Sequence, residues 1–249
     1  MDLSGRIAVC ISGQIRTGVE TSLCILGYLG DLKEAVDIFI HTWDNESESP
    51  WTPDNANRDS HVVANTFRPV DPAVIKKIYE IYQPLDMRVD NYEIYQQCRH
   101  KQVTMRSLLN VAQVPMFQSI WESNRLKVSH ETLSNSKYNM VIRLRFDLDF
   151  GPGRTLAEDL SYIAEKKDIL YFVDHQNKFP DAVEDICWIT SSPIMDIICD
   201  FLLERETNIK MSTVDWQTHL TKYLQQKGVV ARPFKNNNVT IRRNKFIEE

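Results

Sequence analysis

The chain has 249 residues, of which 43% are hydrophobic and only 8 are glycine, so it is long enough to bury a sizeable core. Its formal net charge is -5, from 29 lysines and arginines against 34 aspartates and glutamates. Because a general nucleic-acid surface carries a basic excess, this balance predicts no nucleic-acid partner. We expect a single domain over 1–249, with a loosely ordered polar tail over 235–249.

The sequence carries no signal for a membrane or a secretory compartment. Residues 1–6 include an acid and no long apolar stretch, and no apolar run reaches membrane-spanning length. We therefore expect a cytoplasmic protein without a transmembrane segment. The five cysteines are scattered and form no Cys-x-x-Cys pair, which predicts reduced residues set in the core.

The start of the chain has the pattern of a βαβ unit. We expect a buried strand over 7–11, a polar turn over 12–17, a helix over 21–32 and a second strand over 36–40. In parallel sheets, ligands bind outside the carboxyl ends of the strands. The polar turn and the segment 41–44, which follows the second strand, are therefore predicted to lie side by side.

These two segments supply candidate contacts to a substrate. The candidates are Ser12, Gly13, Gln14, Arg16, His41 and Trp43. Backbone N–H groups of the turn, together with the Arg16 side chain, can hold a phosphate or a base edge. The turn is neither a Gly-x-Gly-x-x-Gly fingerprint nor a Walker loop, so a plain strand-to-helix turn is the competing interpretation.

The middle of the chain alternates irregular and regular segments. We expect, in order, a long polar loop over 45–68, a helix capped by Asp71 and Pro72 and ended by Pro84, a strand over 85–89, an irregular stretch over 91–105 and a helix over 115–134. On the last helix, we expect Lys127 and His130 to lie on a solvated face. Arg125 lies close enough in sequence to the next strand to contact a phosphate.

The run over 138–150 is the most informative part of the sequence. Apolar residues alternate with others that become charged toward its carboxyl end, where Arg143, Arg145, Asp147 and Asp149 lie. The two acids, at i and i+2 of an extended chain, share a face and lie about 6–7 Å apart. They can bind one divalent cation, and the competing interpretation is a set of exposed ion pairs of little energetic weight.

The last third of the chain alternates again. We expect a helix over 156–165, strands over 169–173 and 185–190, helices over 193–204 and 214–226, and a strand over 229–233. Strands that alternate with helices in this way are typical of an α/β fold with a mostly parallel central sheet flanked by helices.

Four segments, taken together, resemble glycosyltransferases of the GT-A type that build bacterial or viral surface glycans. The segments are 8–17, 37–43, 141–150 and 184–189. The resemblance spans nearly the whole chain in order and spacing. It implies a single-domain GT-A-like fold, a nucleotide-sugar donor that is most commonly UDP-linked, a glycan acceptor, and a divalent ion, Mn²⁺ or Mg²⁺, that bridges the diphosphate of the donor.

The resemblance also implies roles for residues already singled out. Donor binding falls on the turn over 12–16 and the metal motif on Asp147 and Asp149. A cation held by Asp149 would stabilise the departing diphosphate as a Lewis acid. Asp147 can share the metal or bind a ribose hydroxyl, while Arg143 or Arg145 can neutralise phosphate or position Asp147.

Candidates for the remaining roles lie later in the chain. An inverting reaction needs a base for the acceptor hydroxyl, and Asp185 and Asp215 are the candidates. The competing interpretations are a water-facing strand acid for Asp185 and a helix cap for Asp215. His219 can complete the metal sphere. Trp188 and Trp216 can form an apolar platform for a sugar ring, or belong to the core.

Two other classes of protein remain open at this stage. A metal-dependent nucleotidyltransferase would use the same acids to attack the α-phosphate of a nucleoside triphosphate and release pyrophosphate. A non-catalytic sugar- or nucleotide-binding protein would bind without turnover and without dependence on Asp149. Fold analogy does not separate these classes.

Overall fold

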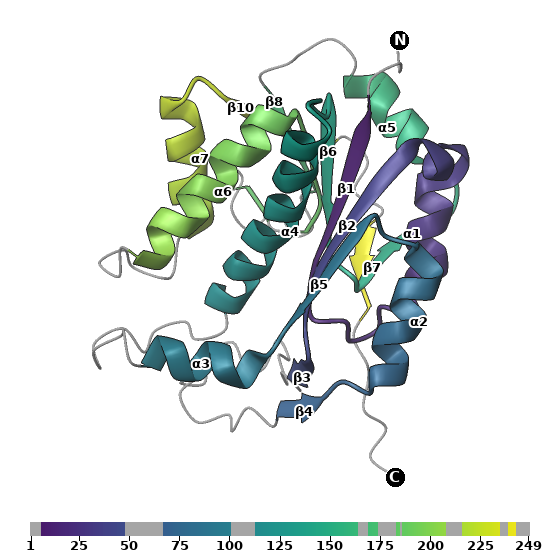
Figure 1. The fold of residues 1–249 in the computed structure, drawn as a ribbon. Helices are drawn as coiled ribbons and strands as arrows, with labels where there is room; N and C mark the ends of the chain where they lie inside the picture. The colour runs from purple at the N-terminus through teal and green to yellow at the C-terminus, as the bar shows by residue number, and fades with distance from the viewer. Residues whose placement is uncertain are drawn as a thin grey trace, which may run out of the picture.

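A seven-stranded sheet forms the centre of the molecule (Figure 1). The computed structural model describes residues 6–47, 67–100, 113–163, 169–173, 183–184, 186–207, 216–234 and 239–242. The central strands are β1 (Ile7–Gly13), β2 (Val36–Trp43), β5 (Asp86–Asp90), β6 (Met140–Leu144), β8 (Ile169–Phe172), β9 (Trp188–Thr190) and β10 (Val230–Pro233). Their order across the sheet is β10-β8-β9-β6-β1-β2-β5.

The central sheet is mostly parallel. The strand β9 is antiparallel to both its neighbours, and the other adjacent pairs are parallel. Two small antiparallel sheets pair β3 (Asn45–Ser47) with β4 (Phe67–Pro69) and β7 (Leu148–Phe150) with β11 (Val239–Ile241). The predicted α/β class, with a mostly parallel sheet flanked by helices, is confirmed.

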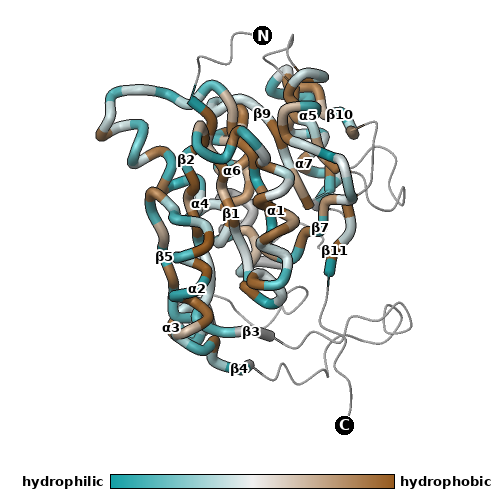
Figure 2. The backbone as a smooth tube through the Cα atoms, turned by 90° about the vertical axis from the view of Figure 1, so that its right-hand side faces the viewer, coloured by the Kyte–Doolittle hydropathy of each residue, from teal (hydrophilic) through white to brown (hydrophobic). Residues whose placement is uncertain are grey.

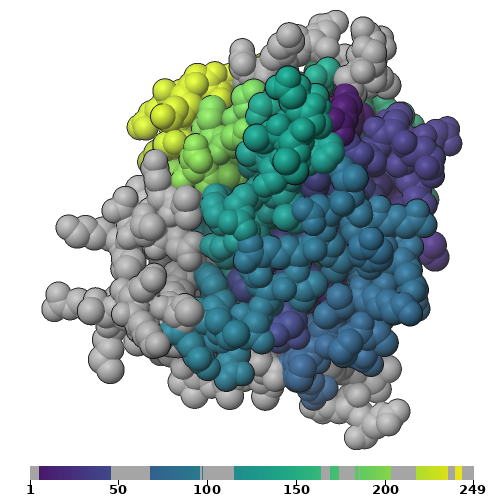
Figure 3. All heavy atoms as spheres, viewed as in Figure 1, coloured from purple at the N-terminus to yellow at the C-terminus, as the bar shows by residue number. Residues whose placement is uncertain are grey.

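Helices cover both faces of the sheet. The helices of the described segments are α1 (Ser22–Leu29), the 3₁₀ helix η1 (Gly30–Ala35), α2 (Pro72–Tyr82), α3 (Tyr92–His100), α4 (Gln113–Leu133), α5 (Leu156–Ile163), α6 (Ser192–Thr207) and α7 (Trp216–Gln226). In Figure 1, α1, α2 and α5 lie on one face and α4, α6 and α7 on the other. The last three form a continuous surface in the space-filling view (Figure 3). In the described segments, none of the helices is both long and apolar enough to cross a bilayer.

The alternation of side chains along β1 divides the interior into two cores. Ile7, Val9 and Ile11 pack in the core shared with α1, α2 and α5, whereas Ala8 and Cys10 face the core shared with α4 and α6. This follows from the two-residue period of a strand that is buried on both faces. The helix α2 carries hydrophobic and hydrophilic residues side by side (Figure 2), as expected for one buried side.

Several predicted elements are present with small shifts. Asp71 caps α2, since its Oδ1 accepts a hydrogen bond of 2.8 Å from the backbone N–H of Ala73.

The thiols of Cys10, Cys187 and Cys199 are buried and unpaired by disulfides, as expected, while Cys24 is half-buried.

Two expectations about the segments between β2 and α4 were wrong. The stretch predicted as irregular contains the helix α3, and the predicted loop over 45–68 contains β3 and β4 at its two ends. Within the predicted tail, the structure describes residues 239–242, of which 239–241 form β11. These short elements depend on partners distant in sequence, which local patterns do not reveal.

The run over 138–150 is not one strand. The strand β6 ends at Leu144, a turn covers 145–147, and β7 then joins β11 in a separate sheet. The turn buries Phe146, whose carbonyl oxygen accepts a hydrogen bond from the Thr21 hydroxyl. The two acids therefore lie on different elements, Asp147 in the turn and Asp149 in β7.

Candidate functional site

The carboxyl ends of β1, β2 and β6 meet at one edge of the sheet. Ser12 is in register with His41 of β2, and Ile11 is in register with Leu144 of β6. The strand order reverses here, because β2 and β5 lie on one side of β1 and β6 lies on the other. Ligands of open α/β sheets bind at such a reversal. The predicted neighbourhood of the two polar segments is thus confirmed.

The turn after β1 holds Arg16 in an unusual backbone conformation. Its φ of 44° is in the left-handed region, which costs a non-glycine residue about 1–2 kcal/mol. The side chain is held on both sides: Nε donates to Gln14 Oε1 at 3.1 Å, and Nη1 lies 3.5 Å from Asp147 Oδ2. Such strain persists where the surroundings fix the residue, often at functional sites.

Gly18 allows this turn to approach the turn after β6. A Cβ atom at Gly18 would lie 2.8 Å from the carbonyl oxygen of Ile15 and 3.1 Å from Phe146 Cβ. The Gly18 N–H donates to the same Ile15 oxygen at 2.6 Å. A side chain at this position would push the two turns apart, so glycine is required by the close packing.

Asp147 is a buried carboxylate held by two arginines. Arg145 donates to both of its oxygens, Nε to Oδ1 at 2.8 Å and Nη2 to Oδ2 at 2.7 Å. The Asp147 side chain is 3% exposed, against 18% for Arg145 and 28% for Arg16. Burial raises the pKa of Asp147, but Arg145 and then Arg16 lower it more, so the net shift is downward.

Asp149 is paired with Arg242 of the carboxyl-terminal segment. Arg242 Nε and Nη2 each lie 2.6 Å from Asp149 Oδ2. The backbone of Arg242 is also fixed, because its N–H donates to the carbonyl of Asp147 at 2.8 Å and its carbonyl accepts from the Thr17 hydroxyl at 3.0 Å. Arg242 therefore joins β11 to the turns after both β1 and β6.

His41 lies near the carboxyl end of β2, in the interior of the protein. The ring is fully buried, with Nδ1 at 2.8 Å from Ser119 Oγ and Nε2 at 3.3 Å from Asp90 Oδ2. The N–H of Gly13 donates to the same Ser119 oxygen at 2.8 Å. The hydrogen bond from His41, followed by Arg88, lowers the pKa of Asp90 to about 2. The structure thus links His41 to the turn after β1 through Ser119.

Arg143, Trp188 and Trp43 are also buried. Arg143 Nε donates to Ser12 Oγ at 3.3 Å, and its guanidinium lies 5.2 Å from the centroid of the Trp188 ring. Trp43 Nε1 donates to the carbonyl of Pro115 at 3.3 Å. Both tryptophans pack in the interior, which favours the core interpretation of Trp188 over a sugar platform.

The remaining candidates are not brought to this edge. Asp185, Asp215 and the side chain of Trp216 lie outside the described residues. His219 lies on α7, which packs against α6 and β10 on the face of the sheet opposite to β7. Across the segments that the structure describes, no three His, Cys, Asp or Glu side chains form a group that could hold a metal.

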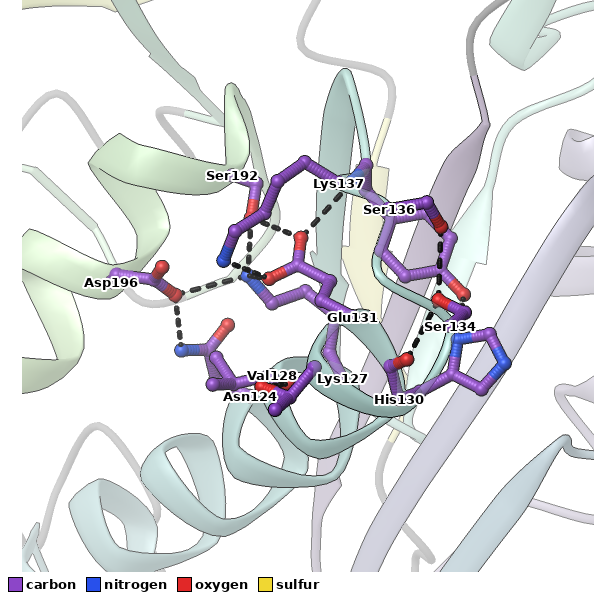
Figure 4. A network of polar contacts seen from close by, with 12 residues as sticks. Asn124, Lys127, Val128, His130, Glu131, Ser134, Ser136, Lys137, Ser192 and Asp196 are labelled. Atoms are coloured by element: carbon purple, nitrogen blue, oxygen red, sulfur yellow. Dashed lines mark hydrogen bonds and ion pairs between the residues drawn. The ribbon is translucent and has the colours of Figure 1, made fainter.

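The predicted solvated position is wrong for Lys127, whereas His130 is half-buried, with its Nδ1 3.0 Å from the Tyr138 hydroxyl oxygen. Lys127 is fully buried and contacts Ser192, with its Nζ 2.9 Å from Asp196 Oδ1 and 3.5 Å from Glu131 Oε2 (Figure 4). Helix α6 covers this side of α4 and supplies two of these partners. The charged side chains therefore form a buried network that joins the two helices.

Sequence reasoning missed three residues of the site. Asp90 directly follows a predicted strand. Its position at the carboxyl end of that strand could have marked it as a site residue. Arg242 follows the short apolar alternation of β11, which is too brief to predict a strand. Ser119 has no local signal, since it contacts His41 from a helix 78 residues away.

Comparisons with known proteins assign no family. No protein-family model matches the chain, and no curated protein matches it. It is similar to 4-diphosphocytidyl-2C-methyl-D-erythritol synthase from Anaerococcus prevotii, with 11% identity and a TM-score of 0.45 over 97% of this chain and 91% of the other. It is also similar to mannosyltransferase PcManGT from Pyrobaculum calidifontis in complex with GDP-Man and Mn²⁺, with 10% identity and a TM-score of 0.44.

The second similarity covers 93% of this chain and 55% of the mannosyltransferase, so the chain spans about half the length of that protein. Both TM-scores are below 0.5. These likenesses therefore assign no function, and the function has to be inferred from the residues at the sheet edge.

Proposed function

We propose that the protein transfers a sugar from a nucleotide-sugar donor to the hydroxyl of a glycan acceptor, with a divalent cation assisting departure of the nucleoside diphosphate. The observation that carries this proposal is the 3.5 Å ion pair between Arg16 and Asp147. It joins the turns after β1 and β6 where the strand order reverses, which is where α/β sheets bind nucleotides.

The charges at this edge suit a diphosphate. Arg16, Arg145 and Arg242 bring three guanidinium groups to Asp147 and Asp149. Guanidinium groups bind phosphate oxygens in a fixed, often bidentate geometry. They can therefore orient the donor and stabilise the negative charge that develops on the leaving group.

The acids at this edge also fit a divalent cation of the Mg²⁺ or Mn²⁺ type. Such ions are commonly bound by one or two carboxylates together with substrate phosphates and water. Asp149 is 21% exposed and can offer its oxygens to a cation. Asp147 is buried and held by two arginines, so we assign it to positioning Arg145 and Arg16. A bound cation would supply Lewis-acid stabilisation of the diphosphate.

The base that accepts the acceptor proton remains a prediction. Asp185 and Asp215 are the proposed candidates, and they lie outside the described residues. His219 as a further metal ligand also remains a proposal, and its helix α7 packs on the face of the sheet opposite to β7, which carries Asp149.

The test is thermal stability of the full chain against UDP, GDP, CDP and their nucleotide sugars, with and without Mn²⁺. Saturation at a hundred times the dissociation constant stabilises by about 2.7 kcal/mol. For a chain of this size, this corresponds to a shift of roughly 5–10 °C. We expect a Mn²⁺-dependent shift with one nucleotide, and no such shift for Asp149→Ala. Asp31→Ala, at an exposed position of η1, is the matched control.

Turnover distinguishes the proposal from its rivals. Release of the nucleoside diphosphate from the sugar nucleotide, lost in Asp149→Ala, supports sugar transfer. Consumption of a nucleoside triphosphate with release of pyrophosphate would instead identify a nucleotidyltransferase. Binding without turnover, unchanged in Asp149→Ala, would identify a binding protein.

A further inference from the structure

The Arg242 side chain is exposed although its backbone is firmly held. The side chain is 53% exposed, and it meets Asp149, which is 21% exposed. Its backbone N–H and carbonyl are bonded to Asp147 and Thr17, on two different turns. The guanidinium can therefore leave Asp149 by side-chain rotation alone, while its Cα stays at the edge of the sheet.

The guanidinium contacts the oxygen that a cation would need. Both Nε and Nη2 of Arg242 lie 2.6 Å from Asp149 Oδ2. A divalent cation bound to that oxygen would sit against two positively charged N–H groups, which is electrostatically unfavourable at this distance. Asp147 differs, because its arginines are more buried and contact both of its oxygens.

We infer that Arg242 is an exchangeable counter-ion of Asp149, which a divalent cation displaces and which then binds the diphosphate of the donor. This inference rests on the proposed function. It makes Arg242 oppose binding of the cation alone and favour binding of the cation together with a nucleoside diphosphate. The two ligands are thereby coupled, each raising the affinity of the chain for the other.

The test is a titration of the full chain with Mn²⁺, with free Mn²⁺ measured by electron paramagnetic resonance, in the absence and presence of UDP or GDP. We expect Arg242→Gln to bind Mn²⁺ alone about twofold to fivefold more tightly, the size of an ion pair between partly exposed groups. With the nucleoside diphosphate present, the same variant should bind Mn²⁺ at least about twofold more weakly, since a phosphate contact is lost.

Two variants control for charge and for position. Arg242→Lys keeps the positive charge and should restore most of the coupling between Mn²⁺ and the nucleotide. Arg232→Gln, at an exposed position of β10, removes a charge elsewhere and should behave as the unmodified chain. Circular dichroism of each variant verifies that the fold is retained.

The outcomes separate this inference from the function on which it rests. If the unmodified chain binds Mn²⁺ and nucleotide through Asp149 but Arg242→Gln changes neither affinity, the exchange is refuted and the proposed function stands. Loss of both affinities in Arg242→Gln would likewise refute exchange, in favour of a structural role. If neither the chain nor any variant binds Mn²⁺ with either nucleotide, both conclusions fail.

Discussion

Replacing Asp147 with asparagine keeps the shape of the side chain and removes its charge. The carboxylate is 3% exposed, accepts two hydrogen bonds from Arg145 at 2.7 and 2.8 Å, and pairs with Arg16 at 3.5 Å. Removing one member of a buried pair costs about 3–5 kcal/mol. Because Arg145 and Arg16 are 18% and 28% exposed, they regain part of their hydration, and we expect a loss of about 2–3 kcal/mol.

The effect of this substitution depends on pH. Burial alone would raise the pKa of Asp147, but Arg145 and Arg16 hold it below its ordinary value in the folded chain. The charge therefore stabilises the fold fully above the unfolded pKa of about 3.9, and this contribution is lost as pH falls through the lower folded value. Asparagine does not titrate. The difference in the free energy of unfolding between Asp147→Asn and the unmodified chain should therefore be largest at neutral pH and should shrink in acid.

Urea unfolding followed by tryptophan fluorescence measures both effects. The chain contains five tryptophans, and the free energy of unfolding follows from linear extrapolation at pH 7 and at about pH 3. Asp31→Asn, at an exposed position, controls for the loss of one acid. A loss in the free energy of unfolding below about 0.5 kcal/mol for Asp147→Asn at pH 7, the size of an ordinary surface substitution, would refute the reasoning. An equal loss at both pH values would refute it as well.

Two further predictions concern packing, and urea unfolding measures both. Lys127→Met leaves buried Glu131 without one of its cations and should cost about 3–5 kcal/mol. Lys76→Met, which removes the cation of an exposed pair with Glu80 on α2, should cost less than about 1 kcal/mol. Equal losses would contradict the burial of Lys127. Gly18→Ala places a methyl group 2.8 Å from a backbone carbonyl and should cost about 1–3 kcal/mol, whereas Gly27→Ala, in α1 with nothing within 4 Å, should stabilise by up to about 1 kcal/mol. A neutral Gly18→Ala would mean that the two turns are not tightly packed.

The part of the site that the sequence predicted depends on parallel strands. The turn after β1 and Asp147 come together because β1 and β6 run side by side in the same direction. Once the strands were recognised from apolar alternation, the rule that carboxyl ends share an edge was sufficient. The partners of Asp147 were harder to predict. Arg16 is 131 residues away in the sequence and contacts Asp147 only because both lie at that edge of the sheet.

The part of the site that the sequence did not predict depends on contacts between distant segments. Arg242 reaches Asp149 across 93 residues because β11 pairs with β7 in a small sheet of its own. His41 contacts Ser119 because α4 packs against β2, the strand that carries the histidine. Neither the length of β11 nor the position of Ser119 gives a periodic signal that can be read locally.

The sequence by itself determined the α/β class, the ends of several helices and the edge at which the candidate site lies. These features follow from local patterns: apolar periodicity, the cap at Asp71, and strands that alternate with helices. Only the tertiary structure decided which charges are buried and which are paired. Lys127 and Asp149 illustrate the reason, because the environment of a charged side chain is set by the elements that pack around it, and those elements come from elsewhere in the chain.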